Sequence, residues 1–177
     1  MAEAFVIMQI GNPELDGVYR EVTVPAVSAT GLTARRVDKH NEGGLLKNEI
    51  VGFIERAQII LADMTNERPN CYLEVGYAMG LGKFKNLILM ARRDHQPDGP
   101  HHDPGGPKVH FDLGGYDVLY WDPTDLPRFR QELETRIRRR LAILEPAGAP
   151  GAIWDDAWVA ELRRRATAGL AKHAEAE

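Results

Sequence analysis

The sequence lacks the features that would stabilise the chain covalently or anchor it in a membrane. Its single cysteine, Cys71, cannot form an intramolecular disulfide, and no Cys/His spacing is typical of a structural zinc site. The first apolar run, in residues 4–10, is far shorter than the roughly 20 residues that a membrane-spanning helix needs. A formal net charge of -4 gives no electrostatic reason to expect duplex DNA or an anionic membrane as the main partner. We therefore expect a cytoplasmic protein.

Several common catalytic motifs are also missing. No G-x-G-x-x-G follows the first apolar run, and neither a Walker-type G-x-x-x-x-G-K-[ST] nor a G-x-S-x-G elbow occurs. These absences argue against a dinucleotide dehydrogenase, a P-loop NTPase and an α/β-hydrolase. Three histidines, His95, His101 and His102, lie in the Pro/Gly-rich segment 92–108 without rigid spacing. We predict a mobile, solvent-exposed loop there and no metal site.

What the chain does contain is a regular alternation of apolar runs and amphipathic segments. The runs predict strands over 5–10, 33–37, 58–62, 87–91 and 118–121. The amphipathic segments predict helices over 16–30, 45–57, 70–82 and 123–144, the first of them kinked at Pro25. Alternation of this kind implies a parallel sheet with right-handed crossovers. The predicted fold class is α/β, a three-layer sandwich with a five-stranded parallel flavodoxin-like (Rossmann-like) sheet in the order 2-1-3-4-5.

The length of 177 residues suits one domain of this kind and a short tail. We predict an α/β domain over 1–145, a Pro/Gly linker over 146–151 and a C-terminal amphipathic helix over 152–177. Trp154 and Trp158 lie four residues apart on that helix. An exposed stripe with two tryptophans would be an unusual apolar patch, so we expect the helix to be buried in a homo-oligomer.

The stretch 58–83 carries the best candidates for chemistry. It predicts a buried strand that ends near Asp63, a polar loop, and a glycine-rich helix that begins near Asn70 and carries Glu74 in its first turns. In open α/β folds, ligands bind in the crevice beyond the carboxyl ends of the strands, where both acids are expected. A carboxylate there can attack a sugar carbon or stabilise a sugar cation.

Each candidate also has a purely structural interpretation. Glu74 can simply interact with the positive end of the helix dipole, and Asp63 can bond to the amides of the loop that follows it instead of holding a ribose hydroxyl. Arg36, at the end of the second predicted strand, can bind a phosphate or pair with Asp38. Cys71 is expected to pack in the interior.

The order of these segments resembles the signature of nucleoside 2-deoxyribosyltransferase-like proteins and of a bacterial TIR-like, predicted nucleotide-binding family. The resemblance covers roughly residues 4–144. Its matching segments are Phe5–Met8, Arg36–Asp38, Ala62–Thr65, Pro69–Ala78, Gly82–Lys83 and Phe111–Leu113.

The resemblance implies a glutamate at the position of Glu74 that attacks or stabilises the anomeric carbon while an N-glycosidic bond is cleaved. The transferases carry D-x-G-T where this chain has 68–71, and an aspartate near the position of Asn48. Both differences bear on protonation of the base and on selectivity for 2-deoxyribose. We assign catalysis to Glu74 and Asp63. The predicted substrate-binding residues are Met8, Gln9, Arg36, Asp38, Asn70 and Tyr77.

The sequence therefore predicts an enzyme that cleaves the N-glycosidic bond of a nucleoside, nucleotide or NAD by hydrolysis or ribosyl transfer. It would need no cofactor, with NAD possible as a substrate, and its partner would be that small molecule. The alternative is a non-catalytic nucleotide-sensing or assembly module of the same fold. A receiver-like phosphoacceptor that uses Asp63 ranks last, because the first strand is not followed by the paired acids that would hold magnesium.

Overall fold

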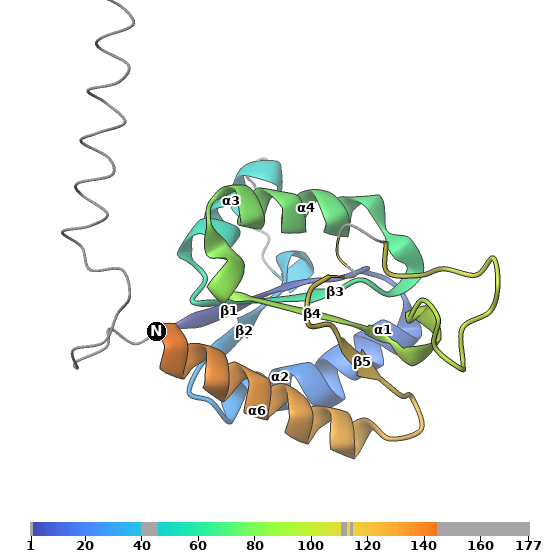
Figure 1. Ribbon diagram of the computed structural model, residues 1–177. Coiled ribbons are helices and arrows are strands. Elements are labelled where there is room, and N and C mark those ends of the chain that lie inside the picture. The colour runs from blue at the N-terminus through green and yellow to red at the C-terminus, as the bar shows by residue number, and fades with distance from the viewer. Residues whose placement is uncertain (1, 40–45, 111–112, 114, 145–177) are drawn as a thin grey trace, which may run out of the picture. The chain divides into compact units, whose positions relative to one another are not determined.

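The computed structural model describes residues 2–39, 46–110, 113 and 115–144. Its centre is a five-stranded parallel sheet in the order β2-β1-β3-β4-β5, which confirms the predicted fold class and strand order (Figure 1). The strands are β1 (Glu3–Ile7), β2 (Thr33–Arg35), β3 (Ile59–Asp63), β4 (Leu87–Arg92) and β5 (Leu119–Trp121).

Helices cover both faces of the sheet. Helices α3 (Leu46–Arg56) and α4 (Pro69–Gly80) cover one face, and α1 (Pro13–Val18), α2 (Val24–Ser28) and α6 (Leu126–Leu144) cover the other (Figure 1). Each layer has its own apolar core, and every residue of β3 is buried because the strand is central and covered on both sides. Within the described residues, no helix combines the length and the apolar character needed to cross a membrane.

The first predicted helix passes its proline without ending. Residues Tyr19–Thr23 form a π-helical segment between α1 and α2, and the N–H of Val24 donates to the carbonyl oxygen of Tyr19, five residues earlier. A proline in a regular α-helix clashes with the carbonyl four residues before it. The wider turn just before Pro25 relieves that clash, so the chain stays helical from Pro13 to Ser28.

Other element boundaries differ from the prediction for local reasons. Strand β2 ends at Arg35, so Arg36 lies just beyond it. Helix α4 begins at Pro69 with Arg68 as its N-cap residue, because proline suits the first helical position, and Asn70 is therefore not the cap. The predicted linker and C-terminal helix, residues 146–177, lie outside the described residues, so the domain boundary and the homo-oligomer stay predictions.

Candidate functional site

A cavity of about 250 Å³ opens at the carboxyl ends of β1 and β3, on the face covered by α3 and α4. These two strands pair in parallel, so the segments that follow them lie side by side. The end of β1 contributes Phe5–Ile10, and the start of α4 contributes Arg68, Asn70, Cys71 and Glu74, with Val37 and Ile50 completing the lining. The structure thus brings together four of the predicted site residues, Met8, Gln9, Asn70 and Glu74.

Glu74 is the only carboxylate among the described residues that line this cavity. It lies in the second turn of α4 and is partly buried. Burial raises the pKa of its carboxyl group to about 7, and no neighbouring cation brings that pKa down again. A carboxylate that changes charge near neutral pH in a cavity is typical of a catalytic or ligand-binding group.

The loop after β3 is held in an unusual conformation beside the cavity. Asn66 and Glu67 have positive φ angles of 67° and 49°, which residues other than glycine adopt at a cost. The side-chain amide of Asn66 donates to Oε1 of Gln9 at 2.9 Å, and its backbone N–H donates to Nε2 of His95 at 2.9 Å. The first bond connects the loop to Gln9, which lines the cavity after β1, and the second connects it to the segment after β4.

His95 is fully buried, which corrects the prediction that this histidine is solvent-exposed, whereas most of the segment 92–108 is exposed or half-buried. Its Nε2 accepts the Asn66 bond, so the ring proton lies on Nδ1 and is donated to Oδ1 of Asp94 at 2.6 Å. A histidine with both nitrogens bonded in this way is a structural tie between β4 and the loop after β3. Among the described residues, no cluster of histidine, cysteine and acidic side chains could hold a metal ion.

Asp63 lies at the end of β3 but does not line the cavity. Its side chain is buried, with only 1% of the residue exposed. One carboxylate oxygen accepts from the backbone N–H of Thr65 at 2.9 Å and the other from Nε1 of Trp121 at 3.2 Å. Burial raises its pKa, although these hydrogen bonds oppose the shift. The geometry is that of a buried acid that shapes the start of the loop.

Arg36 and Asp38 form a closed ion-pair cluster. The Arg36 guanidinium is 3% exposed and contacts Oδ1 of Asp16 and both carboxylate oxygens of Asp38, each at 2.6 Å. It also lies 4.3 Å from the centre of the Tyr19 ring and 3.6 Å from Sδ of Met8. The phosphate-binding role of Arg36 stays a prediction, but each of its three side-chain nitrogen atoms already bonds to a group of the chain itself.

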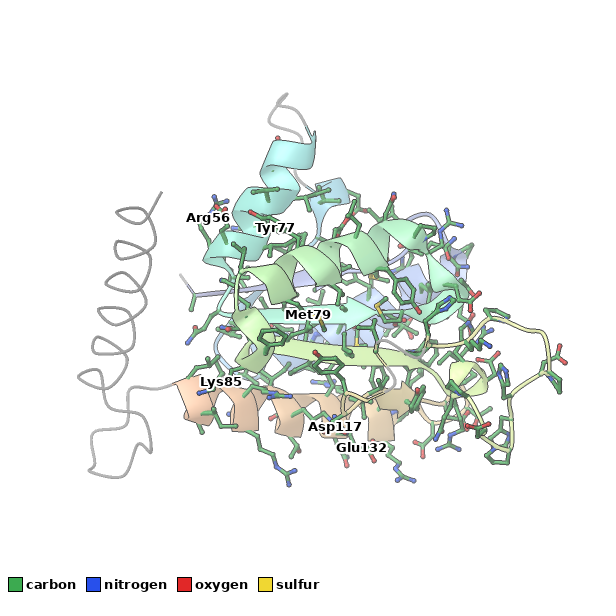
Figure 2. All side chains as sticks on the ribbon, turned by 45° about the horizontal axis from the view of Figure 1, so that its top comes forward. Arg56, Tyr77, Met79, Lys85, Asp117 and Glu132 are labelled. Carbon is green, nitrogen blue, oxygen red and sulfur yellow. The ribbon has the colours of Figure 1, made fainter. Side chains whose placement is uncertain are left out.

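Tyr77 lies one turn beyond Glu74 and faces α3, where its hydroxyl donates to Oε1 of Glu55 at 3.0 Å (Figure 2). It is not among the cavity-lining residues. Cys71 does line the cavity, and burial raises the pKa of its thiol to about 12. The thiol is therefore a packing group and not a nucleophile at neutral pH.

A larger groove of about 530 Å³ lies on the opposite face of the sheet, between the π-helical segment and α6. Its carboxylates are Glu21, which is exposed, and Glu134, which pairs with Arg138 at 2.8 Å. Because Glu21 is exposed and Glu134 is paired with an arginine, we place the candidate chemistry in the smaller cavity at the strand ends.

Arg68 is the charged residue of the described cavity lining that was not among the predicted site residues. It was noted only as a difference from the transferase pattern, yet it lines the cavity together with Glu74. The signal in the sequence was the position of Arg68 directly before Pro69, because a proline often occupies the first position of a helix. The side chain of Asn48, the other noted difference, lies outside the described residues.

Comparison with known proteins supports the fold. No protein-family model matches the chain, and no curated protein matches it. Fifteen chains of solved structures do. One of them is a 2-desoxiribosyltransferase from Leishmania mexicana, 17% identical, with a TM-score of 0.50; the match covers 74% of this chain and 98% of that chain. At this identity the similarity shows the fold alone, which is the deoxyribosyltransferase-like fold predicted above. None of the comparisons supports the TIR-like branch.

Proposed function

We propose that the chain cleaves the N-glycosidic bond of a nucleoside, a nucleotide or NAD, with Glu74 at the anomeric carbon. The observation that carries this proposal is the partly buried Glu74 carboxyl group, whose pKa is raised to about 7, in a cavity at the carboxyl edge of a parallel sheet. A protein named for deoxyribosyl transfer has the same fold, which supports a sugar-bearing ligand.

In the proposed reaction, ionised Glu74 attacks the anomeric carbon. A carbon–oxygen bond forms as the carbon–nitrogen bond breaks, and the base leaves with the electron pair. A departing purine or pyrimidine takes a proton from water, whereas nicotinamide, which is cationic in NAD, leaves as a neutral base and takes none. A second water then attacks the same carbon, its hydroxyl group replaces Glu74, and its other proton returns to solvent. A sugar hydroxyl in place of that water would give ribosyl transfer.

The other residues have supporting roles in this proposal. Gln9 and Asn70 line the cavity, and their side-chain amides have the donors and acceptors that sugar hydroxyls need. Asp63 is a positioning residue, because it orders the loop after β3 through Thr65 and has no access to the cavity. The bond from Asn66 to Gln9 completes the connection between this loop and the site.

A non-catalytic nucleotide sensor remains the second candidate, and one observation favours it. Glu74 is the only carboxylate among the described cavity residues, so the described part of the site holds no second acid to protonate a departing base. A binding module needs only the shape and the polar groups of the cavity.

Free base released from NAD, nucleosides and nucleotides, separated by chromatography, tests the proposal. We expect the parent protein to release base from at least one of them and Glu74→Gln to release none while still binding the same compound. Glu21→Gln, which changes an exposed glutamate on the opposite face, is the matched control and should keep the parent rate.

The pH profile provides an independent test of the role of Glu74. Because the ionised carboxylate is the attacking form, kcat/KM should rise about tenfold per pH unit up to about pH 7 and then level off. If Glu74→Gln cleaves as fast as the parent, Glu74 is not the catalytic residue. Binding without base release by the parent would support the sensor instead.

A further inference from the structure

Arg68 presents a positive charge to the same cavity as Glu74. It precedes α4, its side chain is exposed, and it is the only arginine or lysine among the described cavity-lining residues. In the part of the chain that the structure describes, its guanidinium group forms no hydrogen bond and no ion pair. All of its donors are therefore available to a ligand in the cavity.

Other arginines at this edge of the sheet differ from Arg68 in this respect. Arg36 is held by two aspartates, Arg92 by a glutamate and an aspartate, and Arg93 by Asp122. A ligand anion would have to displace a carboxylate from each of them, at a large energetic cost where the pair is buried. Arg68 could bind an anion without losing any described contact.

The positive and negative groups of the cavity are separated from one another. Arg68 and Glu74 are six positions apart in the sequence, which corresponds to a rise of about 9 Å along a helix axis. The pKa of Glu74 is raised by burial and is not lowered by Arg68, so the guanidinium and the carboxylate do not form a pair. Cys71 lies between them, and its pKa responds to the charges of both groups.

We propose that Arg68 binds a phosphate group of the substrate, so that the ligand of this cavity is a nucleotide and not a neutral nucleoside. This inference rests on the proposed function for the nucleoside part of the ligand. Arginine matches the geometry of phosphate oxygens with two parallel hydrogen bonds. Glu74 would then face the anomeric carbon of the sugar while Arg68 holds the phosphate at the other end of the cavity.

The size of the cavity restricts the class of nucleotide further. A volume of about 250 Å³ lies below the range of about 300–1,000 Å³ that is usual for drug-sized ligands. A nucleoside monophosphate suits this volume better than the much larger NAD. The substrate class is therefore a mononucleotide.

Calorimetric titration separates this inference from the proposed function, because it measures binding and not turnover. The titrants are the common nucleoside monophosphates, each matching nucleoside, and NAD, added to the parent, to Arg68→Gln and to Arg130→Gln. Arg130 is an exposed arginine in the groove on the opposite face and is the matched control. Circular dichroism checks that each variant is folded.

We expect the parent and Arg130→Gln to bind one monophosphate at least about tenfold more tightly than its nucleoside. Arg68→Gln should lose that preference and keep the nucleoside affinity, and Arg68→Lys should retain part of it. Equal affinity of the parent for nucleoside and monophosphate, tighter binding of NAD, or no measurable binding of any monophosphate would overturn the inference. If the parent binds the monophosphate more tightly than the nucleoside, Arg68→Gln loses this preference, and the parent releases no base, then the phosphate-binding role of Arg68 is supported and only the proposed cleavage is contradicted.

Discussion

The pKa of Glu74 predicts that this residue destabilises the folded protein at and above neutral pH. Burial raises the pKa from its usual value of 4.5 to about 7, so the folded state binds a proton that the unfolded chain has already released. Unfolding therefore becomes easier as the pH rises from about 4.5 to about 7, since the unfolded state holds fewer protons in this interval.

The size of the effect follows from the shift. At about 1.4 kcal/mol per pKa unit the full shift would correspond to about 3.5 kcal/mol, and partial exposure of the side chain reduces this to about 1–2 kcal/mol. Glu74→Gln removes the ionisation and keeps the shape of the side chain. We expect the variant to be more stable than the parent by about 1–2 kcal/mol near pH 8 and nearly equal to it near pH 4.5.

Urea unfolding of the parent and of Glu74→Gln over this pH range measures the difference. Asp63, whose pKa burial also raises, is present in both proteins and cancels in the comparison. Glu21→Gln is the control and should follow the parent at every pH, because Glu21 is exposed. A stability difference between Glu74→Gln and the parent that does not grow with pH would show that Glu74 is not a strained, buried carboxyl group.

Three further predictions concern the structure around the site. Trp121→Phe removes a donor to the buried Asp63 carboxylate and should lower the free energy of unfolding by about 1–3 kcal/mol, more at high pH than at low pH. His95→Phe leaves the backbone N–H of Asn66 without its acceptor and should lower the free energy of unfolding by a similar amount, measured by urea unfolding. An unchanged urea midpoint would show that the bond from Asn66 to His95 does not stabilise the fold. Cys71, with a thiol pKa of about 12, should react with iodoacetamide at neutral pH only after unfolding, and mass spectrometry of the labelled native protein checks this.

Strand order and layer structure were accessible from sequence because both depend on local patterns. The fully apolar runs that became β1, β3 and β4 lie in the centre of the sheet, and the alternation with helices fixes a parallel arrangement. Glu74 and Asn70 could be placed near the strand ends for the same reason. Their position follows from the number of residues after a strand and needs no knowledge of distant contacts.

The surroundings of the strand ends were not accessible, because they depend on contacts between residues far apart in the sequence. Asp63 meets Trp121 across 58 positions, and Asn66 meets Gln9 across 57. The sequence pattern around an aspartate at the end of a strand is the same whether its side chain contacts a ligand or a buried indole. His95 was misjudged for the same reason, since the proline and glycine residues around it indicate a loop but do not show what that loop covers.

The distribution of satisfied and unsatisfied charges also points to the cavity. Among the described residues, no buried side-chain nitrogen or oxygen atom lacks a hydrogen-bond partner, and the buried Arg36 and Asp63 are fully bonded within the chain. Glu74 and Arg68 are different, because one is shifted by burial with no compensating cation and the other has no described partner. A carboxyl group shifted by burial in a cavity is typical of a catalytic or ligand-binding site, and the exposed guanidinium of Arg68 is hydrated until an anion binds. Since both groups line one cavity and do not pair with each other, a ligand with an electrophilic carbon and an anionic group would satisfy both at once.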